Sequence, residues 1–274
     1  LKSSRIFSAD LNYIFAFNRL KGRVGVFQTN FYDLIERNSF YYDGVTFVNH
    51  MMTGVNKVHR GIELGLTYKL DGHWSFDLAG TVSEYYYANN PMGTYSIENG
   101  KDVAEYSLQE SERVYMKNVY VGGLPQVAGT FGVRYFIDYW FLGANINAFG
   151  RNFIEVAPAR RTASIYNGYT SGSTTMPAVT PNDPELYGAY QTLTHQEEFD
   201  ADYTIDLSIG KIFYIGRKNS INVNLAFNNI LNNKDVRTGG YEQGRVRVDK
   251  PELFKSKYFY MQGFNCFLNV SYRF

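Results

Sequence analysis

Long stretches of this chain alternate between an apolar and a polar residue, and no other feature constrains the fold as strongly. A period of two is typical of a β-strand whose two faces meet different surroundings. The clearest stretch is Phe199–Phe213. There, Tyr203 and Leu207 belong to the apolar series, and Asp202 and Asp206 belong to the polar one. The alternation predicts an all-β fold.

The pattern occurs about nine times, in stretches of roughly 11 to 16 residues. Strands of globular proteins usually have about 5–6 residues, whereas a tilted strand needs about 9–11 to cross a bilayer. The lengths therefore favour an antiparallel transmembrane β-barrel. The predicted strands are Arg5–Phe17, Arg23–Ile35, Val55–Leu70, Trp74–Ala88, Pro125–Ile137, Trp140–Gly150, Phe199–Phe213, Ile221–Leu231 and the stretch that ends at Phe274. Only Arg23–Ile35 is ambiguous, because both of its faces carry large apolar residues.

The connections alternate in length, as periplasmic turns and extracellular loops do in outer-membrane barrels. The short ones are rich in turn-forming residues and lie at Asn18–Gly22, Asp71–Gly72, Asp138–Tyr139 and Gly216–Asn219. The long ones lie at Glu36–Gly54, Asn89–Leu124, Asn152–Gln196 and Asn232–Ser256. We expect the long loops outside the cell and the C-terminus in the periplasm. A soluble Greek-key protein, the alternative, has no reason to alternate so regularly.

Composition agrees with a barrel. Aromatic residues make up 17% of the chain, with 24 Tyr and 21 Phe, and a membrane barrel can place such rings in its interfacial girdles. No run of about 18 apolar residues exists, so no transmembrane helix is predicted. The net charge of +1 and the lack of a basic run argue against nucleic acid. A single cysteine, Cys266, excludes an internal disulfide.

Nine antiparallel strands cannot close into a ring, because the first and the last would run in the same direction. We therefore expect residues 1–274 to be the C-terminal portion of a larger barrel of about 22 strands around a plugged lumen. The start of the chain, Leu1–Arg5, has no signal peptide although a barrel must be exported. We expect the plug and the N-terminal strands to precede Leu1.

Several passages resemble the C-terminal half of TonB-dependent receptors, particularly the type with a carboxypeptidase-like N-terminal extension. They are Tyr120–Tyr135, Asp138–Leu142, Ala157–Thr162, Asn228–Asp235, Arg237–Gly244 and Phe267–Phe274. The most specific one is the C-terminus, where apolar positions alternate and the last residue is aromatic. In outer-membrane barrels, by family resemblance, this pattern is the signal for the barrel-assembly machinery. Here it comprises Phe264, Leu268, Val270, Tyr272 and Phe274.

The resemblance implies active import of a scarce nutrient across the bacterial outer membrane. It implies a plug domain of the same protein in the lumen, contact with the TonB complex through parts outside this chain, and capture of substrate by the extracellular loops. Outer-membrane lipid and lipopolysaccharide would surround the barrel, and a surface lipoprotein could cap the loops. Two alternatives are a passive porin-type or fatty-acid-type channel without a plug, and a non-transport barrel such as an adhesin or a surface enzyme.

Tyrosines are the first candidates for substrate binding, because an amphipathic ring can stack on a sugar or a peptide. Tyr85 and Tyr87 continue the polar series of their strand near the outer rim, and the others lie in the longest loop, which we expect to be mobile. Girdle residues are the alternative reading for the first two. The loop candidates are Tyr166, Tyr169, Tyr187 and Tyr190.

Acidic residues are the second candidates. Asp200, Asp202 and Asp206 follow one face of a strand, below Glu197 and Glu198. They could contact a cation or a basic substrate, but a hydrated wall or a surface for the plug explains them equally well. Carboxylates on a single strand do not make a calcium site.

No feature of the sequence predicts catalysis, a cofactor or a metal site. The four histidines, at positions 50, 59, 73 and 195, have no paired spacing. No Ser-His-Asp grouping and no phosphate-binding glycine loop is present.

Overall fold

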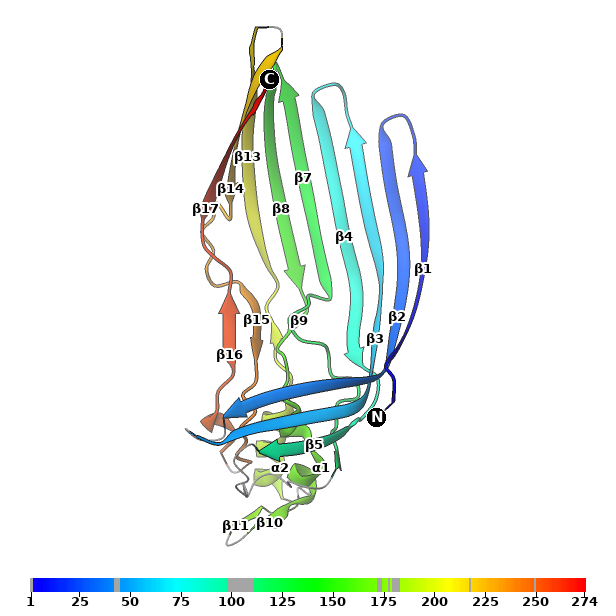
Figure 1. Cartoon of the computed structure of the whole chain (residues 1–274), viewed down its shortest axis with the longest axis vertical. Coiled ribbons are helices and arrows are strands. Elements are labelled where there is room, and N and C mark those ends of the chain that lie inside the picture. The colour runs from blue at the N-terminus through cyan, green and yellow to red at the C-terminus, as the bar shows by residue number, and fades with distance from the viewer. Residues whose placement is uncertain are drawn as a thin grey trace.

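Nine strands follow one another in a single antiparallel sheet, in the order in which they occur along the chain (Figure 1). The computed structural model describes residues 2–41, 45–97, 111–171, 174–176, 178, 183–216, 218–248 and 250–274. The strands are β1 (Arg5–Ala16), β2 (Leu20–Tyr41), β3 (Phe47–Lys69), β4 (Trp74–Tyr87), β7 (Val127–Ile137), β8 (Trp140–Gly150), β13 (Asp202–Ile215), β14 (Asn219–Asn228) and β17 (Asn265–Arg273). The predicted all-β fold of about nine strands is confirmed.

The two ends of the sheet differ. Tight turns and the C-terminus lie at one end, and the long connections gather with two helices at the other (Figure 1). The turn between β7 and β8 consists of Asp138 and Tyr139, with φ values of 46° and 65°. Positive φ at both central residues defines the hairpin turn whose twist matches that of the strands it joins. The predicted alternation of short turns and long connections is confirmed.

The register places like residues beside like residues across the whole sheet. One row runs Leu66, Leu78, Phe131, Ile146 and Ile205 from β3 to β13. All five side chains project from the same face, because alternate residues of a strand point to opposite faces. A slip of one residue in any pair would place apolar groups on the polar face, so the register is strongly specified.

The opposite face is held together by polar side chains. Asp77 accepts a hydrogen bond from the Thr67 hydroxyl at 2.7 Å and forms an ion pair with Arg134 at 2.6 Å. Further along, Asn147 donates to Asp206 at 2.8 Å and accepts from the Thr130 hydroxyl at 2.8 Å. These contacts join β3, β4, β7, β8 and β13 and give the carboxylates of Asp77 and Asp206 hydrogen-bonding partners.

The first long connection is mostly strand, which corrects the loop predicted at Glu36–Gly54. β2 continues to Tyr41 and β3 begins at Phe47. A β-bulge interrupts their pairing between Phe31 and Ile35, and beyond it both strands bend and run across the end of the sheet (Figure 1). Bulges increase local twist and redirect a strand, which explains the bend.

The other long connections also contain regular structure that the sequence did not predict. The shorter strands are β5 (Met92–Ile97), β6 (Glu112–Arg113), β9 (Asn152–Phe153), β10 (Tyr169–Ser171), β11 (Thr174–Met176), β12 (Glu198–Phe199), β15 (Arg237–Tyr241) and β16 (Lys257–Tyr260). The helices are α1 (Ala163–Asn167) and α2 (Pro184–Thr194), with 3₁₀ turns η1 (Pro158–Arg161) and η2 (Pro251–Leu253). No helix in the described part of the chain is long and apolar enough to span a membrane.

Substitutions on adjacent positions of β13 test the two faces. Leu207 pairs with Ala144 and Phe227 in an apolar row, whereas Ser208 pairs with Gly143 and Ala226 on the other face. If hydrocarbon covers the apolar face, Leu207→Arg should destabilise the inserted barrel by about 2–4 kcal/mol. Ser208→Arg should have a much smaller effect. The measurement is urea unfolding of the full-length protein in lipid vesicles, and equal tolerance of both substitutions would contradict the face assignment.

Candidate functional site

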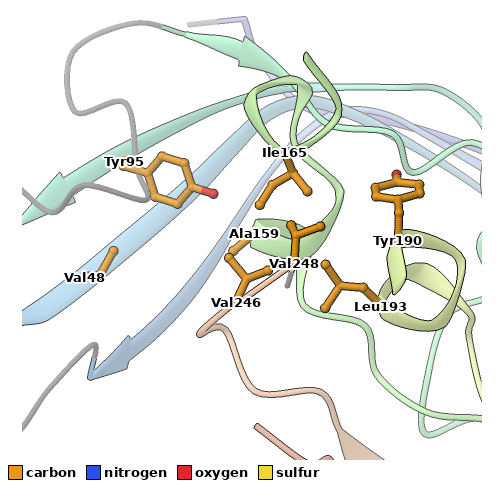
Figure 2. Close-up of a cluster of buried hydrophobic side chains, with 8 residues drawn as sticks. All are labelled: Val48, Tyr95, Ala159, Ile165, Tyr190, Leu193, Val246 and Val248. Atoms are coloured by element: carbon orange, nitrogen blue, oxygen red, sulfur yellow. The ribbon is translucent and has the colours of Figure 1, made fainter. Parts of the chain in front are cut away.

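The long connections fold together into one unit at the end of the sheet, which we call the loop domain. Its first hydrophobic cluster joins residues from β3, β5, η1, α1, α2 and the connection after β15 (Figure 2). Val48, Ala159 and Leu193 are almost completely buried in it. A second cluster includes Met52, Val114 and Met116. Segments that are far apart in the sequence thus share a dry core, which is the usual origin of tertiary stability.

A buried ion pair crosses this core. The guanidinium of Arg161 forms two bonds with the Glu242 carboxylate, at 2.6 and 2.9 Å, and the two side chains are only 2% and 4% exposed. Arg161 also donates to the carbonyl of Thr194, and the backbone N–H of Ala157 donates to Glu242 at 2.8 Å. Because nearly all their polar atoms are satisfied, the two charges can be tolerated away from water.

The neighbouring Arg160 extends this link. Its side chain donates to the backbone carbonyls of Gln243 at 2.8 Å and Phe254 at 2.7 Å. The backbones of Glu155 and Glu242 also pair, at 2.9 Å. The arginines of Ala157–Thr162 therefore tie the connection after β8 to the connection after β14. Both segments were singled out in the sequence by resemblance, but nothing in it showed that they are in contact.

The connection after β4 is attached by two further side chains. Gln196 donates to the carbonyls of Tyr120 and Ile154, at 2.8 and 2.9 Å, and accepts from the Tyr120 N–H. Glu112 accepts from the backbone N–H and the hydroxyl of Ser164. Burial raises the pKa of Glu112, although the bonds from Ser164 act in the opposite direction. The loop domain is thus a single hydrogen-bonded body, and not a set of independent loops.

His50 is a buried residue that sequence reasoning passed over. It lies on the part of β3 that pairs with β5, outside the part that pairs with β4. Its ring is completely buried 4.4 Å from the ring of Tyr95, and neither ring nitrogen has a hydrogen-bond partner among the described residues. Burial lowers the pKa of His50 from 6.5 to about 4, because the charged form would have to leave water.

The loop tyrosines do not form one surface. Tyr190, on α2, is buried in the first cluster (Figure 2), and Tyr166 packs against it with ring centroids 4.1 Å apart. Tyr187, on the same helix, is 38% exposed. The side chain of Tyr169 lies outside the described residues. Because Tyr190 is buried, neither face of its ring is free to stack on a substrate. Within the loop that we expect to be mobile, α1 and α2 supply residues to the first cluster.

Tyr85 and Tyr87 lie on the polar face of β4, as predicted. Tyr85 is half-buried, 4.7 Å from the ring of His59. Tyr87 is buried, donates to Glu36 at 2.8 Å and has the ammonium of Lys57 4.5 Å from its ring. Tyr87 therefore belongs to the second hydrophobic cluster, where the loop domain meets β4. Tyr85 is two residues away on the same face of β4 and is less buried.

The acidic residues separate into two groups. Asp200 is exposed, whereas Asp202 accepts from the Asn233 side chain at 2.9 Å and Asp206 belongs to the polar network of the sheet. Glu197 forms an ion pair with Arg237 at 2.6 Å and accepts from the Tyr258 hydroxyl at 2.6 Å. No group of acidic, histidine or cysteine side chains suited to a metal ion occurs within the described ranges.

The sheet with its loop domain was compared with solved structures. The copper transporter OprC matches 99% of this chain with 13% identity and a TM-score of 0.53. The chain therefore has the same fold as the matching part of OprC. It spans 31% of the length of the OprC chain. No protein-family model and no curated protein matches the sequence.

Two other solved structures are similar over nearly the whole chain. The ferric-catecholate import receptor Fiu from E. coli K12 matches 99% of it, with 16% identity and a TM-score of 0.45, and the match covers 28% of Fiu. FpvA from P. aeruginosa, bound to heterologous pyoverdines, matches 98%, with 13% identity and a TM-score of 0.43, and the match covers 27% of FpvA.

Breaking the buried ion pair should loosen the loop domain. Arg161→Gln leaves the Glu242 carboxylate buried without its partner, which should cost the loop domain about 3–5 kcal/mol. The half-exposed pair of Arg237 with Glu197 provides the control, because Arg237→Gln should cost about 1 kcal/mol or less. The measurement is hydrogen exchange of α1 and α2 in the full-length protein. Equal protection in both variants would contradict a central role of the pair.

Acid should weaken the loop domain through His50. Above pH 6.5 the imidazole is neutral in both the folded and the unfolded state. Between pH 6.5 and about 4 only the unfolded state takes up the proton, so folding loses up to about 3 kcal/mol as the pH falls through this window. His50→Phe retains a ring beside Tyr95 and should abolish this loss. Protease sensitivity of the loop domain from pH 7.5 to 4 measures it, and an unchanged pH profile in the variant would disprove the assignment.

Proposed function

We propose that this chain is the C-terminal part of a TonB-dependent importer in the bacterial outer membrane. The observation that carries the proposal is the register of the sheet, which aligns apolar rows on one face and polar side chains on the other from β3 to β13. Such a wall suits hydrocarbon on one side and a wet lumen on the other. The similarity to the fold of the copper transporter OprC supports the same class of protein.

The edges of the sheet support a larger barrel. β1 and β17 each have a single neighbour among the described strands, and they are not paired with each other. An unpaired strand edge in lipid costs several kcal/mol for each backbone group that lacks a partner. We infer that further strands of the same protein join β1 to β17 and complete a barrel of about 22 strands. A plug within that lumen and a TonB-contacting segment would belong to the same additional sequence.

Orientation follows from the two ends of the sheet. In outer-membrane barrels the short turns face the periplasm and the long loops face outward. By this rule the loop domain is extracellular and Phe274 lies in the periplasm. Asp200 and Tyr187 are exposed on this domain, and Tyr85 lies below it on the luminal face. We propose that substrate binds between them, with Asp202 and Tyr166 at the edges of the surface.

The packed loop domain favours a receptor over a passive porin-type channel. A pore needs only an open mouth, whereas a receptor needs a surface whose shape is set before the ligand arrives. A shared core, a buried ion pair and side chains that bridge three connections provide such a surface. A surface lipoprotein that caps this domain would add a second wall to the site, and we propose no enzymatic activity.

Conductance of the full-length protein in planar lipid bilayers tests the proposal. A plugged importer should carry almost no steady current, and deletion of the plug should open a large ohmic pore. Binding of the full-length protein to the C-terminal domain of TonB provides the second measurement. A stable open pore in the full-length protein, together with no binding to TonB, would support the porin-type alternative and contradict the importer proposal.

A further inference from the structure

A groove of about 870 Å³ crosses the apolar face of the sheet from β3 to β13. Its floor consists of residues with little or no side chain. Gly80, Gly129 and Ala148 are direct cross-strand neighbours, and Gly150 lies in the adjacent row. Because Gly80 and Gly129 lack a Cβ, the surface is lower here than in rows such as the one through Leu78 and Phe131.

Large apolar side chains border this floor. Leu64 and Tyr203 stand at the two ends of the row that contains Gly80, and Ile62 and Val127 belong to the next row. All of them project from the apolar face, on the half of the sheet nearer the loop domain. Apart from Thr81 and Asp202, the lining residues of the groove are apolar or glycine. In the orientation proposed above, the groove lies in the outer leaflet of the membrane.

A second depression of about 410 Å³ adjoins the groove and shares Ile62 and Val82 with it. Its other lining residues include Gln28, Arg60, Glu84 and Arg151. Arg60 and Glu84 lie two residues beyond Ile62 and Val82, about 7 Å farther toward the loop domain. The charged residues Arg60, Glu84 and Arg151 thus lie beyond the apolar groove, on the side that faces the cell exterior, and we call them the arginine step.

The charge of this step is positive. Arg60 forms an exposed pair with Glu84, at 2.7 Å, which leaves part of its guanidinium open. Arg151 donates to the hydroxyl of Tyr120 at 3.0 Å and has no carboxylate partner in the part of the chain that the structure describes. The second depression is therefore lined by two guanidinium groups and one carboxylate, which gives it a net positive charge. Guanidinium is the group best suited to bind phosphate through paired hydrogen bonds.

We propose that the groove and the arginine step form a binding site for lipopolysaccharide, the phosphorylated glycolipid of the outer leaflet. An acyl chain lies in the groove, and a phosphate of the headgroup contacts Arg60 and Arg151. This inference rests on the outer-membrane barrel proposed above and adds a specific lipid site to it.

The order of the two depressions matches an amphiphile better than a protein partner. The apolar groove is complementary to the acyl chains of a lipid, and the arginine step is complementary to an anionic headgroup that points outward from the leaflet. A partner strand would require a free backbone edge, but β3, β4, β7 and β8 are each paired on both sides in this region. A glycerophospholipid also has one phosphate and apolar chains, so the experiment separates the two kinds of lipid.

The test uses the full-length protein, purified in detergent and mixed with lipid A or, separately, with phosphatidylglycerol. Native mass spectrometry measures the fraction that retains each lipid. We expect the wild-type protein to retain lipid A, and Arg60→Gln with Arg151→Gln to bind it about tenfold more weakly. Ala148→Leu, which fills the groove with an equally apolar group, should weaken binding to a similar extent.

Matched controls separate the site from general effects. Ala144→Leu adds the same side chain on the same face of β8 but outside the groove, and Lys117→Gln removes an exposed cation of the loop domain. Neither should change lipid A retention. Equal retention in all variants, or equal retention of phosphatidylglycerol by the wild-type protein, would overturn the site. Heat-modifiable migration reports barrel assembly separately, so a wild-type protein that forms no barrel would instead refute the proposed function.

Discussion

Backbone hydrogen bonding in the absence of water is the constraint on which this structure depends. A strand that crosses hydrocarbon must pair along its full length on both sides, since each unpaired N–H or C=O costs several kcal/mol. From β2 to β14 each strand of the sheet pairs with a neighbour on both sides over most of its length, and this pairing is the same one that aligns the apolar rows. Backbone pairing and the separation of the two faces are therefore one condition, because a register slip would disrupt both.

The luminal face adds a second level of fit. Several glycines lie on it, and a polar side chain of the neighbouring strand lies over Gly25, Gly132, Gly143 and Gly210. A Cβ at Gly132 would come within 2.5 Å of the Asn145 amide oxygen, and one at Gly210 within 2.3 Å of the Asn224 oxygen. Short amide side chains thus lie flat against the wall and do not project from it.

The sequence predicted the wall well and the loop domain poorly, for a physical reason. Alternation is a local signal, so the pattern within one strand is enough to predict that Leu207 and Ser208 lie on opposite faces, whatever the partner strand is. The loop domain is organised by contacts without a period, such as that of Arg161 with Glu242, which are 81 residues apart. Tyrosines in loops are ambiguous for the same reason. Tyr187 and Tyr190 look alike in the sequence, yet one is exposed on α2 and the other is buried in the core.

Wall and loop domain also differ in what stabilises them, and this difference separates their functions. The wall has no interior of its own, so its apolar face gains stability only when lipid covers it. The loop domain has a hydrophobic core of its own, from which water is excluded. It also contains two groups that make it less stable than it could be, the buried pair of Arg161 with Glu242 and the ring of His50. A buried ion pair is seldom more stabilising than well-packed apolar side chains, and an imidazole without partners costs further free energy. Such groups favour one particular arrangement of the segments at a cost in stability. In the loop domain, that arrangement is the surface that an incoming solute would meet first.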